Sequence, residues 1–278
     1  MSAAGITDNT HRFPGRVLSS SPAATALPSR DRLLIVACIV LITVLAWAYL
    51  VHLGREMSAA MEHDKMMAEM GMTMDMPWSA ADVFFTFAMW AVMMVGMMAP
   101  SALPMFLLFA ATRAGRDRRG MSLATLAFGL GYIAVWTGFS LGATAAQWGL
   151  HQAAMLSGAM ASSSRSLSGA ILIAAGAYQL TPWKNKCLTH CRSPLGFLMT
   201  HWRDGIRGSF RMGFDHGAYC LGCCWALMCV LFVVGVMNLI WVAAISGFVL
   251  AEKVGPAGVV VARIAGSVMI VLGGVAFF

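Results

Sequence analysis

The chain has 278 residues, of which 59 % are apolar and only 11 % are charged, whereas soluble domains carry about 25 % charged residues. The charges lie between long uncharged stretches, which excludes an ordinary soluble domain and predicts an all-α, polytopic transmembrane helix bundle. The net charge of +7 comes from short basic segments between the apolar runs, and no basic run is interleaved with aromatic residues, so nucleic acid is excluded as a partner.

The apolar runs divide the chain into a short polar segment and one membrane domain. Residues 1–31 are rich in Ser, Pro and Ala, and we expect them to be disordered, in front of a single transmembrane domain at 32–278. About 20 apolar residues cross a bilayer core as a helix. Because two of the runs are short and two turns are tight, the sequence predicts six or seven spans. The predicted spans are residues 33–53, 81–112, 122–150, 167–183, 213–236, 237–253 and 257–278.

Basic residues predict the orientation of these spans. Lys and Arg concentrate in the N-terminal segment, around 113–119, and in the loop at 184–212, and alternating spans bring all three to one side. Since cytoplasmic loops carry the excess of Lys and Arg, we expect a cytoplasmic N-terminus and a cytoplasmic loop at 184–212. The segment 54–80 is then an external loop.

That external segment is rich in methionine. Residues 57–76 contain eight methionines together with His63. Thioethers are soft, neutral ligands that suit Cu(I), and they form no disulfides in an oxidising compartment. The segment therefore has the composition of an outer copper collector, with an amphipathic interfacial segment as the alternative.

The second span continues the methionine pattern in two stripes. Met93 and Met97 follow Met89 along one side of the predicted helix, while a second stripe holds Met94, Met98, Met105 and Ser101. A methionine stripe in a membrane helix more often packs than binds. Because it directly follows the external methionines, we nominate Met93 and Met97 as ligands. In the third span, Gly138 and Gly142 predict a close helix approach.

The loop at 184–212 carries two cysteines one helical turn apart, Cys187 and Cys191. The surrounding Lys184, Lys186 and Arg192 are expected to lower their thiol pKa values and favour the thiolate, the form that binds metal. His201 adds a ligand or caps a helix.

The strongest motif is DHGAYCLGCCWALM at 215–228. On a helix, His216, Cys220 and Cys223 share one face with Met212, and Cys224 lies next to it. These groups suit a soft metal ion, while a Cys220/Cys223 redox pair and simple packing are the alternatives. Further along, we expect Glu252 and Lys253 to pair with each other.

Several strings resemble a known family. They are MWAVMMVGMMAPSALPM, PWKNKCLTHCRSPLGF, HWRDGIRG, GFDHGAYCLGCCWALM and GVMNLIW. They are similar to a bacterial family of predicted metal-binding integral membrane proteins, a domain of unknown function whose members are sometimes labelled copper chaperones, over roughly residues 78–278. The resemblance implies a multi-pass protein of the bacterial inner membrane with a Cys/His metal site. It places that site on Cys187, Cys191, His201, His216, Cys220, Cys223 and Cys224.

Together these features predict a protein that acquires Cu(I), transfers it, or delivers it to a membrane cuproenzyme, with the lipid bilayer and a periplasmic or cytoplasmic metal carrier as further partners. Another thiophilic metal fits the same ligands. No Ser/His/Asp triad, phosphate loop or catalytic carboxylate pair can be assembled, so an enzyme is the less favoured class. Two alternatives stay open: a dithiol oxidoreductase using Cys220/Cys223 with Cys187/Cys191 as a relay, and a non-catalytic accessory subunit of a membrane complex.

Overall fold

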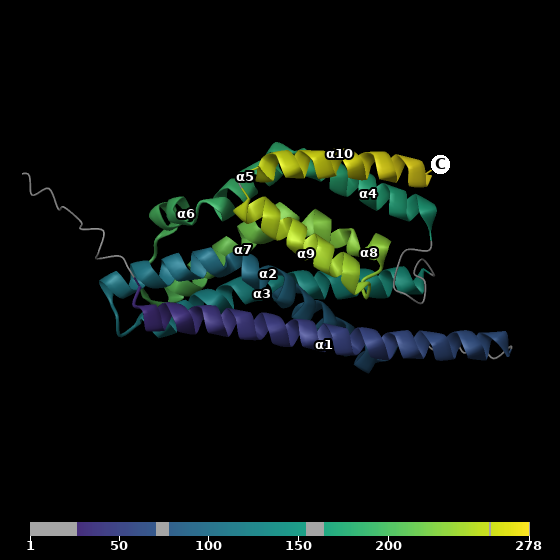
Figure 1. Cartoon of the computed structure of the whole chain (residues 1–278), viewed down its shortest axis with the longest axis horizontal. Helices are drawn as coiled ribbons and strands as arrows, with labels where there is room; N and C mark the ends of the chain where they lie inside the picture. Colours follow the sequence, from purple (N-terminus) through teal and green to yellow (C-terminus); the bar gives the residue numbers. More distant parts are fainter. Residues whose placement is uncertain (1–26, 71–77, 154–163, 256, 278) are drawn as a thin grey trace, which may run out of the picture.

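The computed structural model describes residues 27–70, 78–153, 164–255 and 257–277, and all regular secondary structure in them is helical. The long helices lie side by side along the longest axis of the molecule (Figure 1). In chain order the helices of these residues are α1 (Ser29–Glu69), α2 (Ala80–Arg116), α3 (Met121–Gln152), α4 (Arg165–Gln179), α5 (Pro182–Arg192), α6 (Pro194–His201), α7 (Gly205–Cys229), α8 (Leu231–Val234), α9 (Leu239–Val254) and α10 (Gly258–Phe277).

Five helical segments are long and apolar enough to cross a bilayer: Ser29–Ala60, Ala80–Arg116, Met121–Gln152, Gly205–Val234 and Gly258–Phe277. Helices α4 and α9 have 15 and 16 residues, fewer than the roughly 20 that a full crossing needs. The all-helical architecture is therefore confirmed, with five segments among the described residues that could span a membrane. The count of six or seven spans stays a prediction.

The first part of the predicted external loop at 54–80 is helical and not a loop, because α1 continues as one helix to Glu69. That this segment is external remains a prediction. Alanine, methionine and glutamate, which dominate this stretch, are strong helix formers. The C-terminal part of α1 extends beyond the ends of its neighbours (Figure 1), and Met66 and Met70 are exposed on it. Residues 71–77 lie outside the described residues, as do residues 1–26 of the expected disordered segment, while Ser29–Asp31 already belong to α1.

The predicted loop at 184–212 also contains helices. Thr181 caps α5 by accepting a hydrogen bond from the Lys184 backbone N–H (3.3 Å), and Pro182 occupies the first turn. Pro194 begins α6 in the same way. Proline is well suited to a first helical turn because its missing N–H would have no partner there. The cysteines of this segment are therefore held on a helix.

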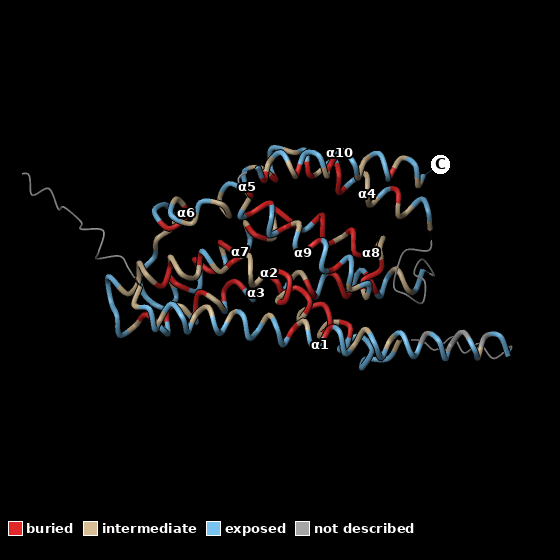
Figure 2. Tube along the Cα trace, viewed as in Figure 1, coloured by how far each residue is buried: buried red, intermediate tan, exposed pale blue. Residues whose placement is uncertain are grey.

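Two glycines set the crossing of α3 and α7. A Cβ atom at Gly213 would overlap the carbonyl group of Phe128, and one at Gly131 would overlap the carbonyl of Phe210. The expectation that Gly138 and Gly142 provide this close approach is wrong, since a Cβ at either position would meet open space. Most buried side chains lie where α2, α3, α7 and α9 face one another, and α1 and α10 are largely exposed (Figure 2).

The basic segments gather at one end of the bundle. At the end of α2, Arg116 lies 3.6 Å from the Asp204 carboxylate and 4.3 Å from the ring centroid of Trp202, just before α7. Helices α5 and α6 and the start of α1 lie at this same end (Figure 1). The described parts of the three basic regions thus lie at one end of the bundle. That this side is cytoplasmic remains a prediction.

Candidate metal centre

Helix α7 carries the cysteines and the histidine of the 215–228 motif on the side that faces the core. His216 is 3 % exposed, and Cys220, Cys223 and Cys224 are each 1 % exposed. Steps of four and three residues return to the same face of a helix that has 3.6 residues per turn. The close crossing near Gly213 presses this face against α3. Three thiols and one imidazole are thereby removed from solvent and lipid.

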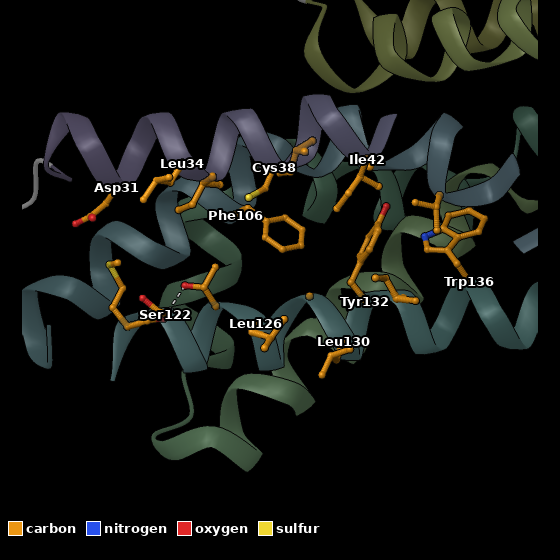
Figure 3. A pocket seen from close by; sticks show the side chains of 18 residues that line it. Asp31, Leu34, Cys38, Ile42, Phe106, Ser122, Leu126, Leu130, Tyr132 and Trp136 are labelled. Atoms are coloured by element: carbon orange, nitrogen blue, oxygen red, sulfur yellow. Dashed lines mark hydrogen bonds between the residues drawn. The ribbon is translucent and has the colours of Figure 1, made fainter. Parts of the chain in front are cut away.

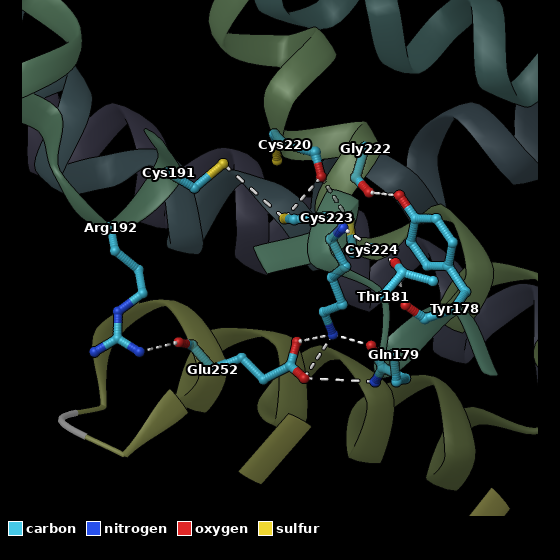
Figure 4. Close-up of polar contacts among 11 residues, drawn as sticks. Tyr178, Gln179, Thr181, Cys191, Arg192, Cys220, Gly222, Cys223, Cys224 and Glu252 are labelled. Carbon is cyan, nitrogen blue, oxygen red and sulfur yellow. Dashed lines mark hydrogen bonds and ion pairs between the residues drawn. The ribbon is translucent and has the colours of Figure 1, made fainter. Parts of the chain in front are cut away.

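Helix α5 brings a fourth thiol to this region. The sulfur of Cys191 lies 4.0 Å from that of Cys223, and Figure 4 shows the two side chains turned toward each other. Contacts with the Cys220 and Cys223 sulfurs raise the pKa of Cys191 well above its ordinary value. Cys191 is therefore a thiol at neutral pH in this arrangement.

Cys187 lies one turn earlier on α5, beside Gly222 of α7. A Cβ at Gly222 would approach the Cys187 sulfur to 2.8 Å. The expectation that neighbouring cations lower the pKa of this thiol is wrong: burial, together with the Cys223 sulfur, raises it. Two of the nearby cations bind other groups: Lys184 pairs with Glu252, and Arg192 donates a hydrogen bond to the Gly255 carbonyl (2.7 Å).

Cys220 is contacted by two polar groups from other helices. The Lys253 ammonium of α9 donates to the Cys220 sulfur (2.9 Å) and to the Ser101 hydroxyl of α2 (3.0 Å). The hydroxyl of Tyr132 on α3 lies 3.1 Å from the same sulfur. The positive charge next to this sulfur favours its thiolate form. Sequence reasoning nominated neither Lys253 nor Tyr132.

The expected pairing of Glu252 with Lys253 is also wrong. The Glu252 carboxylate binds the ammonium of Lys184 at 2.7 and 2.9 Å, and the Gln179 side chain lies beside both groups (Figure 4). Lys184 and Glu252 are 0 % and 1 % exposed. This buried ion pair joins α5 to α9 next to the thiols.

The methionine that reaches the thiols comes from the second stripe of α2. The Met98 sulfur lies 4.0 Å from that of Cys224. Met93 and Met97 are buried in the same apolar core, and their nomination as ligands stays a prediction. Ser101, which receives the Lys253 ammonium, belongs to the stripe of Met98 as well.

The two nominated histidines occupy different surroundings. His216 stacks near Phe128 and Tyr132, with ring centroids 6.1 and 5.9 Å away, and its Nδ1 has no hydrogen-bond partner. His201, at the end of α6, stacks on Phe197 at 4.7 Å and engages the Thr200 hydroxyl through Nδ1. His216 is thus a buried imidazole with one free nitrogen next to the thiols, and Phe197, whose ring centroid is 5.4 Å from that of His216, lies between it and His201.

An apolar cavity of about 360 Å³ lies between α1, α2 and α3 (Figure 3). Cys38 of α1 and Phe106 of α2 line it, and so does the ring of Tyr132. The hydroxyl of the same tyrosine reaches Cys220. Tyr132 therefore contacts both this cavity and the Cys220 sulfur.

We refer to Cys191, Cys220, Cys223, Cys224 and Met98 as the sulfur cluster. In the parts of the chain that the structure describes, no three His, Cys, Asp or Glu side chains already stand as an assembled metal site. The Cys223 and Cys224 thiols instead donate to the Cys220 carbonyl (3.1 and 3.0 Å). Thiols and thioethers are the donor types that suit soft ions such as Cu(I).

Comparisons with known proteins place the chain in a family. No curated protein and no solved structure matches it. A family model named PpoB2 and described as copper chaperone matches residues 87–276, well over half of the chain. The matched region runs from α2 to α10 and includes every member of the sulfur cluster. The chain therefore belongs to the PpoB2 copper chaperone family.

Proposed function

We propose that the protein binds Cu(I) as cargo at the sulfur cluster and transfers or delivers it within the bacterial inner membrane. The observation that carries this proposal is the meeting of thiols from α5 and α7 with a thioether from α2 in one buried region. The membrane-spanning helices and the copper chaperone family support it. Soft sulfur donors are the ligands that Cu(I) prefers.

The spacing of the sulfurs supports a shared ion. With metal–sulfur bonds of about 2.3 Å, two sulfurs 4.0 Å apart meet one ion at an angle of about 120°. The Cys191–Cys223 and Cys224–Met98 sulfur pairs both have this separation. His216, with its free Nδ1, supplies a further ligand, and Cys187 receives or releases the ion at the edge of the cluster.

The arrangement along the bundle suggests a direction of transfer. The exposed methionines on the extension of α1 lie at the end opposite α5 and the basic segments (Figure 1). In this proposal, thioethers collect Cu(I) outside, Met93 and Met97 pass it along α2, and thiols hold it near the cytoplasmic end. His201, Cys187 and Cys191 then face the carrier or membrane cuproenzyme that receives it. Transfer from thioethers to thiolates proceeds toward the softer, charged ligand.

The test is metal binding by the purified protein. The full chain in detergent is loaded with Cu(I) under anaerobic, reducing conditions, freed of loosely bound ion, and examined by elemental analysis and X-ray absorption at the copper edge. We expect sulfur ligands at about 2.3 Å. Replacing Cys220, Cys223 and Cys224 together by Ser removes the bound copper.

A matched control replaces Cys38 and Cys229 by Ser. Cys38 is exposed on α1, and Cys229 lies at the end of α7, outside the cluster. This variant loses two thiols and keeps its copper. Retention of copper by the triple variant, or equal loss in the control, contradicts the proposal.

The 4.0 Å contact between Cys191 and Cys223 also favours one second function, dithiol redox exchange. In that case a small-molecule disulfide oxidises the two thiols to an inter-helix disulfide and is itself reduced to two thiols. Thiol labelling then changes with the redox state and is unaffected by a copper chelator. If the chelator alone restores labelling of copper-loaded protein, copper binding is supported instead.

A further inference from the structure

Lys253 is a buried cation that contacts the Cys220 sulfur. Lys253 is 8 % exposed, and its ammonium donates hydrogen bonds to the Cys220 sulfur and the Ser101 hydroxyl. The neighbouring carboxylate of Glu252 is held by Lys184 on the other side of α9. The charge of Lys253 is thus directed at the sulfur cluster.

The hydrogen bonds of the cluster define its charge. Cys223 and Cys224 act as S–H donors to the Cys220 carbonyl. Cys220 accepts from the ammonium and is the negative member. One thiolate and one ammonium leave the buried region neutral, which avoids the high cost of an uncompensated charge away from water.

We propose that Lys253 makes the sulfur cluster selective for monovalent over divalent soft ions. This inference rests on the proposed function. Two thiolates, the Lys253 ammonium and Cu(I) together carry no net charge, whereas a divalent ion in the same site leaves one buried positive charge. Ligand type alone does not make this distinction, because thiolates bind Zn(II) as well as Cu(I).

Binding balances without any redox change. Cu(I) forms one bond to the Cys220 thiolate and one to a second sulfur, Cys223 or Cys191, whose S–H bond breaks and whose proton goes to water. The ammonium leaves the Cys220 sulfur and keeps its contact with the Ser101 hydroxyl. Copper remains Cu(I) throughout.

The experiment compares Cu(I) and Zn(II) affinities of the detergent-solubilised full chain, each measured by competition with a chromophoric chelator. For Lys253→Gln we expect a lower affinity for Cu(I). The affinity for Zn(II) falls by less than this or rises, so the ratio of the Cu(I) affinity to the Zn(II) affinity falls at least about tenfold. Lys253→Arg keeps the charge and changes the ratio by less than about threefold. Lys186→Gln removes a positive charge from α5 outside the cluster and leaves the ratio as in the wild type.

A folded Lys253→Gln protein with an unchanged ratio overturns the inference, and so does an equal fall in Lys186→Gln. If the Gln variant does not fold, the wild-type protein decides by the number of protons displaced per bound ion. The inference is supported if one proton is released for each bound Cu(I) and more than one for each bound Zn(II), which must recruit further thiolates. Equal numbers of released protons overturn it. If the wild-type protein binds no Cu(I), the proposed function fails as well. If the wild type binds Cu(I) and Lys253→Gln has the same ratio of Cu(I) to Zn(II) affinity, only the inference about Lys253 fails.

Discussion

Cys191 and Cys223 are 32 residues apart in the chain, yet their sulfurs lie 4.0 Å apart because α5 packs across α7 beside Gly222. Cys187, on the same helix as Cys191, reaches the edge of this contact. The two cysteines of α5 therefore differ in position even though they are one turn apart.

This difference predicts unequal effects of substitution. Cys191→Ser removes a sulfur that faces Cys223 and lowers Cu(I) affinity at least about tenfold. Cys187→Ser keeps all members of the sulfur cluster and lowers the affinity by less than about threefold. Competition with a Cu(I) chelator measures both, and equal losses would show that the two cysteines have the same role.

The methionine stripes of α2 predict a second contrast. Leucine has nearly the volume of methionine and no sulfur, so Met98→Leu removes the thioether next to Cys224 while the core stays filled. We expect Cu(I) affinity to fall several-fold, by about 1 kcal/mol of binding free energy. Met97→Leu, made in the other stripe, is the matched comparison and has the smaller effect. A larger loss in Met97→Leu would assign the ligand role to the stripe nominated from the sequence.

The buried Lys184–Glu252 pair predicts a stability effect in the metal-free protein. Lys184→Met leaves the Glu252 carboxylate without its cation and lowers the free energy of unfolding by about 3–5 kcal/mol. Adding Glu252→Gln removes the unpaired charge and recovers most of the loss. Thermal unfolding in detergent compares the single and double variants; a double variant as unstable as the single one would mean that packing, and not charge, holds α5 on α9.

The crossing of α3 and α7 predicts a steric effect. Gly213→Ala places a methyl group against the Phe128 carbonyl and costs about 1–3 kcal/mol by overpacking. Gly142→Ala meets open space and is neutral or slightly stabilising, since alanine favours the helix by up to about 1 kcal/mol. Melting temperatures of the two variants provide the measurement. Equal behaviour would place the close approach elsewhere.

Much of the fold follows from the sequence because apolar runs and helical periodicity are local properties. The long spans and the shared face of His216, Cys220 and Cys223 need only the length and repeat of one helix. The helices within 184–212 were missed although Thr181-Pro182 and Ser193-Pro194 are helix-start signals. The close crossing was assigned to Gly138 and Gly142 because small residues alone do not identify the partner helix.

The contacts between helices could not be predicted in the same way. Both methionine stripes of α2 are apolar, so nothing local decides which of them faces Cys224. Glu252 and Lys253, in contrast, could have been separated: neighbours on a helix point about 100° apart and do not pair. A charged residue inside an apolar segment is itself a signal of a functional contact, and Lys253 carried that signal.

Tyr132 links two regions that otherwise have different surroundings. Its ring lines the apolar cavity between α1, α2 and α3, whose rim side chains Leu34, Leu126 and Leu130 are each more than half exposed, and its hydroxyl lies 3.1 Å from Cys220. Acyl chains or detergent tails that enter this cavity would contact the ring whose hydroxyl lies next to the Cys220 sulfur. The composition of the surrounding bilayer, or of the micelle that replaces it, becomes part of the chemical environment of Cys220.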